Sequence, residues 1–107
     1  MRYFTYLCVL IYSVTIASAA TINVSTPGSL NTLVTNPNMS NLTLTGSIDA
    51  RDFKYIRDNM PNLVTLDITN TSITSYSGLG GTSSSATDIY PANTIPTYAF
   101  CDPNTHT

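Results

Sequence analysis

The fold of this chain is decided by residues 62–69, NLVTLDIT, in which apolar and polar side chains alternate. Successive side chains of a β-strand point to opposite faces, so this alternation predicts a half-buried strand. Residues 41–45, NLTLT, repeat the pattern and predict a second strand. The interval from Leu42 to Leu66 equals the interval from Leu44 to Ile68. Two such units at one fixed step predict a solenoid.

A helix is predicted between these strands. Asp49 is placed to cap its first turn, and Phe53, Ile56 and Met60 recur three to four residues apart, which gives the helix one apolar face. Pro61 then ends the helix. The basic residues that follow position 20 are Arg51, Lys54 and Arg57, and their spacing predicts a solvated helix face interleaved with Asp52 and Asp58.

A shorter unit precedes these elements. Residues 22–24, INV, predict a short strand. Residues 25–28, STPG, resemble a helix start, since proline is tolerated in a first turn. Leu30, Leu33 and Val34 follow at helical spacing, and residues 36–38, NPN, stop this helix. The order strand, helix, strand, helix, strand predicts an α/β fold.

Residues 1–20 have the pattern of a cleavable secretory signal peptide. Met1 and Arg2 form a short positive region, an uncharged stretch of about 14 residues follows, and residues 17–20, ASAA, provide small residues for cleavage after Ala19 or Ala20. The apolar stretch is shorter than the roughly 20 residues that a spanning helix needs. We therefore expect a secreted or cell-surface protein with no membrane span after cleavage. Cys101 is then the remaining cysteine, so no disulfide can form within the mature chain.

The last third of the chain changes in character. Residues 75–92 contain the run GLGGTSSS and predict a low-complexity surface loop. No lysine follows these glycines, which argues against a phosphate-binding loop. Residues 21–74 are predicted to form an N-terminal cap and repeat-like units. Residues 93–107 are predicted to be the truncated start of a further repeat.

The apolar residues from Leu63 to Ile73 follow the leucine-rich repeat spacing, L-x-x-L-x-I-x-x-T-x-I, with Thr71 at the position where that repeat places Asn or Cys. Residues 95–101, IPTYAFC, resemble the IP-x-x-AF signature of BspA-like leucine-rich repeat proteins, which are found largely on bacterial cell surfaces. Cys101 follows Phe100 directly, slightly earlier than in that family. The resemblance covers roughly residues 21–101.

This resemblance implies a leucine-rich-repeat solenoid fragment, with short parallel strands, short helices and an N-terminal capping unit. It implies that Ala99 and Phe100 pack into the solenoid core. It also implies that further repeats of the full-length chain follow, and that such proteins bind partners through the sheet face.

No set of residues predicts catalysis. His106 lies next to the end of the chain, and there is no Glu. Asp49 and Asp52 are three residues apart at a helix start, where carboxylates cap backbone N–H groups, so a cap is favoured over an acid–base pair. No His and Cys spacing suits a metal, no cofactor motif is present, and we do not expect an enzyme. The net charge of −2 argues against nucleic acid as a partner.

The remaining candidate site is the side of the two strands that faces away from the core. We expect this face to bind a protein or glycan ligand. Two alternative functions stay open. The residues of this face are merely solvated in a structural cap that has no ligand of its own, or the chain is an accessory domain of an exported enzyme. The candidate binding residues are Asn41, Thr43, Thr45, Thr65, Asp67 and Thr69.

Overall fold

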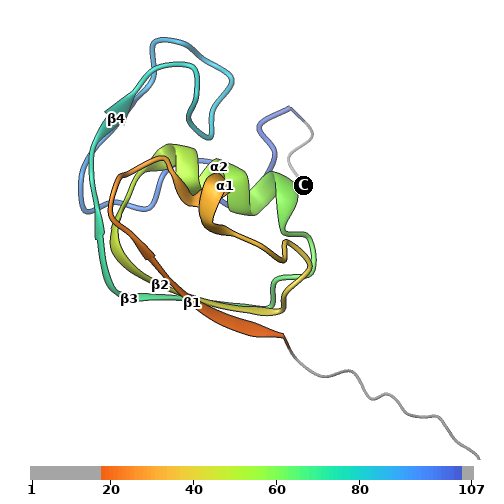
Figure 1. Ribbon diagram of the computed structural model, residues 1–107. Coiled ribbons are helices and arrows are strands. Elements are labelled where there is room, and N and C mark those ends of the chain that lie inside the picture. The colour runs from red at the N-terminus through yellow and green to blue at the C-terminus, as the bar shows by residue number, and fades with distance from the viewer. Residues whose placement is uncertain (1–17, 105–107) are drawn as a thin grey trace, which may run out of the picture.

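The computed structural model describes residues 18–104, so most of the proposed signal peptide and His106 lie outside the described residues. Three strands run along one side of the molecule and two short helices lie over them (Figure 1). The elements, in chain order, are β1 (Ala19–Val24), α1 (Leu30–Leu33), β2 (Asn41–Ile48), α2 (Ala50–Asn59), β3 (Thr65–Ile73), β4 (Tyr76–Ser77) and β5 (Ile89–Tyr90). The predicted α/β class is confirmed.

The three long strands form a parallel sheet in the order β1-β2-β3, with β2 in the centre. Leu42 pairs with Ala20 on one side and with Leu66 on the other. The predicted step between strands is therefore confirmed at Leu42 and Leu66. The step from Ala20 to Leu42 is shorter than the step from Leu42 to Leu66, so the spacing between strands is not constant.

A register shift separates the first half of the β2–β3 pairing from the second. Thr43 pairs with Asp67, but Thr45 pairs with Asn70 and not with Thr69, which a constant step would place there. One additional residue on β3 thus produces an irregularity after Asp67. The predicted equivalence of Leu44 and Ile68 falls within this shift.

The core lies between the sheet and the helices. Leu42, Leu44 and Ile48 of β2 are buried on the inner face, where Phe53 and Ile56 of α2 belong to the same cluster. The other fully enclosed members are Val24, Leu30, Met39, Met60 and Ala99. The predicted helix with one apolar face is confirmed, and it ends at Asn59, shortly before Pro61.

The first strand begins earlier than the sequence predicts. It starts at Ala19 because the Ser18 carbonyl accepts hydrogen bonds from the backbone N–H groups of Ser40 and Asn41, at 3.1 and 3.0 Å. The two proposed cleavage positions lie inside this strand. Cleavage after Ala20 would leave Thr21 to Val24 as the paired part of β1.

Residues 75–92 contain the short antiparallel pair of β4 and β5. Their Tyr76 and Tyr90 rings stack with centroids 6.1 Å apart. Tyr90 is buried, and its hydroxyl accepts a hydrogen bond from the Ser83 N–H at 2.8 Å. Thr82 is also buried, and its hydroxyl donates to the Thr97 carbonyl. Parts of this segment are therefore packed, although Leu79 and Ile89 are exposed.

Gly46 allows β1 and β2 to approach each other closely. Its φ is +91°, and a methyl group at this position would overlap the Val24 carbonyl oxygen.

Replacing Gly46 with alanine is expected to lower the free energy of unfolding by about 2 kcal/mol, because a side chain is penalised both by the left-handed backbone and by the close approach of the strands. Urea unfolding monitored by circular dichroism measures this change. Ser47→Ala, on the neighbouring residue, is the control and should change stability by less than about 0.5 kcal/mol; equal losses would refute this role for Gly46.

Candidate functional site

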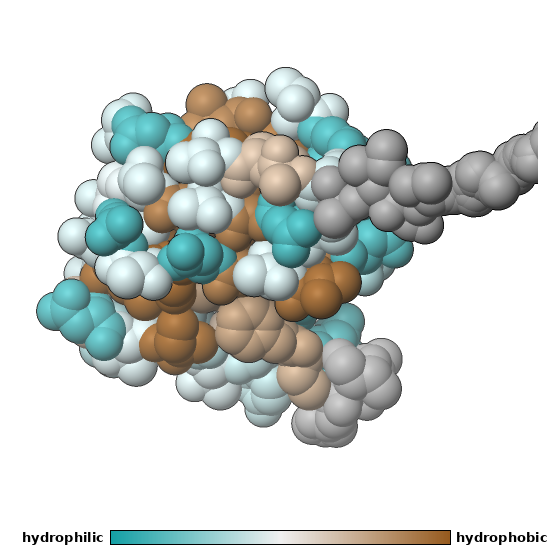
Figure 2. All heavy atoms as spheres, turned by 90° about the horizontal axis from the view of Figure 1, so that it is seen from below, coloured by the Kyte–Doolittle hydropathy of each residue, from teal (hydrophilic) through white to brown (hydrophobic). Residues whose placement is uncertain are grey.

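The candidate site is the outer face of the parallel sheet. Strand pairing places Asn41 beside Thr65, and Thr43 beside Asp67. Thr21 of β1 lies on the other side of Thr43, which makes a continuous row across all three strands. Figure 2 views the molecule from the sheet side, with hydrophilic and near-neutral residues over much of its surface. The structure therefore brings four of the six candidate residues together in adjacent pairs.

The other two candidates, Thr45 and Thr69, are not direct partners. The register shift places Asn70 opposite Thr45. On the β1 side the Thr45 hydroxyl donates a hydrogen bond to Oδ1 of Asn23 at 3.0 Å. The sequence-based list omitted Thr21, Asn23 and Asn70, although the alternation of Thr21 and Asn23 about Ile22 could have indicated the first two.

Exposure differs between the strands of this face. Thr43 and Thr45 of the central strand are half-buried, whereas Thr65, Asp67 and Thr69 of β3 are exposed. Neighbouring strands on both sides shield β2 from solvent. A partner would therefore meet the exposed side chains of β3 with the least obstruction.

Asp67 supplies the negative charge of this face. Its Oδ1 accepts a hydrogen bond from the Thr69 backbone N–H at 2.9 Å. Hydrogen bonds from the Thr69 side chain and backbone lower the pKa of Asp67. A lowered pKa favours the ionised form, so its contribution to stability is present above the ordinary pKa and is lost as the pH falls through the lowered value.

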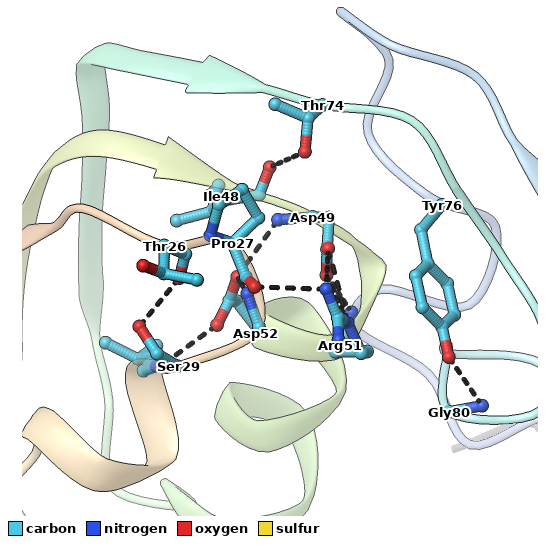
Figure 3. A network of polar contacts seen from close by, with 12 residues as sticks. Thr26, Pro27, Ser29, Ile48, Asp49, Arg51, Asp52, Thr74, Tyr76 and Gly80 are labelled. Carbon is cyan, nitrogen blue, oxygen red and sulfur yellow. Dashed lines mark hydrogen bonds and ion pairs between the residues drawn. The ribbon is translucent and has the colours of Figure 1, made fainter.

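The carboxylates of Asp49 and Asp52 accept hydrogen bonds from backbone N–H groups. Asp52 is 1% exposed, and its Oδ2 accepts from the N–H groups of Gly28 at 2.7 Å and Asp49 at 3.0 Å, while Oδ1 accepts from Leu30 at 3.0 Å. Asp49 accepts from the Arg51 N–H at 2.9 Å (Figure 3). The two residues form a capping box. The predicted cap is confirmed, and Asp52 also joins α2 to the start of α1.

The prediction of a solvated charged face was wrong for Asp52, which the backbone N–H groups draw into the interior. Arg51 also has partners: its Nη2 lies 2.6 Å from Oδ2 of Asp49 and donates to the Pro27 carbonyl at 3.0 Å. Its guanidinium carbon lies 4.6 Å from the centre of the Tyr76 ring (Figure 3). Ring and cation attract each other electrostatically, which helps hold β4 against α2.

Arg57 holds the later loops. Its Nη1 donates to the carbonyls of Thr82 at 2.7 Å and Tyr98 at 3.0 Å, and its Nε lies 2.7 Å from Oδ1 of Asp58. The hydrogen bond with Asp58 raises the pKa of Arg57. The Arg57 side chain is 10% exposed, so the prediction of a solvated helix face was also wrong for this arginine, which has a structural role.

The IP-x-x-AF segment packs only in part. Ala99 is buried in the core, but Phe100 is 62% exposed, with its ring edge-on to Phe53 at a centroid distance of 6.2 Å. Phe100 and Leu66 contribute to an open groove of about 280 Å³ along the β3 side. The remaining lining residues are Ile56, Arg57, Met60, Pro61, Leu63 and Val64. The expectation that Phe100 packs into the core is not met, because its outer face has no covering layer within residues 18–104.

Within the described part of the chain, no three His, Cys, Asp or Glu side chains gather in a way that could hold a metal ion. No helix among residues 18–104 has the length and apolarity of a membrane span. The sheet face offers hydroxyl, amide and carboxylate groups, which can donate and accept hydrogen bonds to a partner.

No protein-family model matches this chain, and no curated protein matches it at a significant level.

Proposed function

We propose that this chain is the N-terminal part of a secreted or cell-surface leucine-rich-repeat protein, and that its sheet face binds a protein or glycan partner. The observation that carries the proposal is the strand register. It aligns Thr21, Thr43 and Asp67 in one row, with Asn41 and Thr65 in the next. Hydroxyls and amides at strand spacing present an ordered array of hydrogen-bonding groups to a ligand.

Two features support a solenoid of this type. Three parallel strands follow one another in chain order, as a stack of repeats requires. Thr71, at the polar position of the repeat spacing, donates from its hydroxyl to the Leu44 carbonyl at 2.6 Å. That bond links one unit to the next, which is the role that a polar ladder residue has between stacked turns.

A binding assay on the secreted chain tests the sheet face. A printed panel of extracellular glycans and matrix proteins first identifies a ligand that the chain binds. Thr43→Arg places a long cation at the centre of the face and is expected to weaken binding to that ligand at least tenfold, because central interface residues dominate affinity. Surface plasmon resonance then measures the affinity.

The matched control is Thr87→Arg, because Thr87 is an exposed threonine in the segment between β4 and β5. It should leave binding unchanged. Equal affinity of Thr43→Arg and the unmodified chain would contradict a role for the sheet face, and so would failure of the chain to bind any member of the panel.

The second candidate function is a structural cap, and the β3 side favours it. Val64 is 83% exposed and lines the groove together with Leu66 and Phe100. An edge strand with adjacent apolar side chains is a surface that further repeats would cover. A longer chain that binds the panel while this chain does not would support the cap.

An accessory role in an exported enzyme is the third alternative, and the sequence that follows codon 107 in the gene would test it.

A further inference from the structure

A second hollow lies on the helix side of the molecule, away from the sheet face. Its volume is about 370 Å³, which is within the range of small-molecule sites. It lies where α1, α2 and the loop after β4 meet. Its lining residues are Gly28, Asn31, Arg51, Lys54, Tyr55, Asp58, Asn59 and Gly80.

The charges around this hollow leave one cation available. Arg51 forms an ion pair with Asp49, and Asp58 forms one with Arg57. Lys54 is half-buried, and within residues 18–104 its side chain forms no hydrogen bond or ion pair. Lys54 lines this hollow, and an ammonium group without an anionic partner favours a ligand that carries a negative charge.

Asn31, Asn59 and Tyr55, which also line the hollow, can contact the ring of a sugar in addition to an anionic group. Asn31 is exposed, and Asn59 uses its Nδ2 to donate to the Tyr55 carbonyl at 3.3 Å, which leaves its side-chain oxygen free to accept. Amide side chains can donate and accept, so they match the hydroxyl groups of a sugar. The half-buried Tyr55 adds an aromatic side chain with an apolar body and a polar tip, against which the C–H face of a sugar ring can pack.

We propose that this hollow binds an acidic sugar, a pyranose ring with a carboxylate, in which Lys54 receives the carboxylate and Asn31, Asn59 and Tyr55 contact the ring. The proposal does not rest on the sheet-face function, because the two surfaces lie on opposite sides of the core. The hollow adds a site for a single sugar unit to a chain whose expected partners are extracellular.

The test uses the isotope-labelled, secreted chain and three probes, glucuronic acid, glucose and acetate, with backbone amide shifts recorded by NMR. Glucuronic acid is expected to bind at least about tenfold more tightly than glucose or acetate, because a charged hydrogen bond adds to the ring contacts. The largest shifts should occur at Lys54 to Asn59 and at Gly80.

Two variants of one residue separate the charge from the shape. Lys54→Gln should reduce the affinity for glucuronic acid to that for glucose, whereas Lys54→Arg should retain most of it. Thr43→Ala on the sheet face is the control and should change neither. Equal binding of acetate and glucuronic acid, an unaffected Lys54→Gln variant, or shifts confined to the sheet face would each overturn the proposal.

Discussion

Replacing Asp52 with alanine is expected to lower the free energy of unfolding by about 3–5 kcal/mol, because the change strands several buried hydrogen-bond donors at once. The carboxylate is 1% exposed and accepts from the N–H groups of Gly28, Leu30 and Asp49. Alanine removes the cap of α2 and the link to α1 in one step. Urea unfolding of the chain, monitored by circular dichroism, measures the loss.

Asp58→Ala is the matched control, further along the same helix. Its side chain is 38% exposed and pairs with Arg57, so we expect a change below about 1 kcal/mol. Asp52→Asn keeps one acceptor oxygen and should fall between the two alanine variants. Similar losses for Asp52→Ala and Asp58→Ala would show that the carboxylate at position 52 does not join the helices.

Replacing Phe53 with alanine is expected to cost about 3–5 kcal/mol, the range for removing a buried aromatic side chain. Phe53 is 0% exposed in the core cluster that contains Leu42 and Leu44 of the central strand, and its ring also meets the edge of Phe100. Alanine would leave a cavity between α2 and the sheet. The same unfolding assay measures the effect.

Phe53→Leu keeps most of the apolar contact and should cost about 1–2 kcal/mol, so it remains measurable if the alanine variant does not fold. Val64→Ala is the control for removal of an apolar side chain, because Val64 is 83% exposed and its change should be within about 0.5 kcal/mol. If Phe53→Leu and Val64→Ala had the same effect, α2 would not be packed as described.

The sequence predicts the central elements of this fold for clear physical reasons. Alternation at residues 41–45 reflects a strand with one buried face, and the spacing of Phe53, Ile56 and Met60 reflects one apolar helix face. Both patterns follow from local geometry, and so does the cap at Asp49. The pairing of Thr43 with Asp67 on the candidate face follows from the interval between Leu42 and Leu66, which also pair with each other.

Other features depend on contacts that local patterns do not contain. The burial of Asp52 requires Gly28 and Leu30, which belong to the preceding unit of the chain, before β2. The register shift that moves Asn70 opposite Thr45 accompanies the hydrogen bond from the Thr69 N–H to Asp67, and alternation alone does not reveal an additional residue. Packing of the glycine- and serine-rich segment depends on Arg57, which is distant in sequence from the Thr82 and Tyr98 carbonyls.

Cross-strand nuclear Overhauser effects at Thr43 test the central claim, a parallel sheet in which β2 lies between β1 and β3 and turns its polar face outward. We predict backbone contacts from Thr43 to Thr21 on one side and to Asp67 on the other, in the pattern of parallel strands. Contacts from Thr43 to only one of these residues, or an antiparallel pattern, would contradict the sheet and the binding face that rests on it.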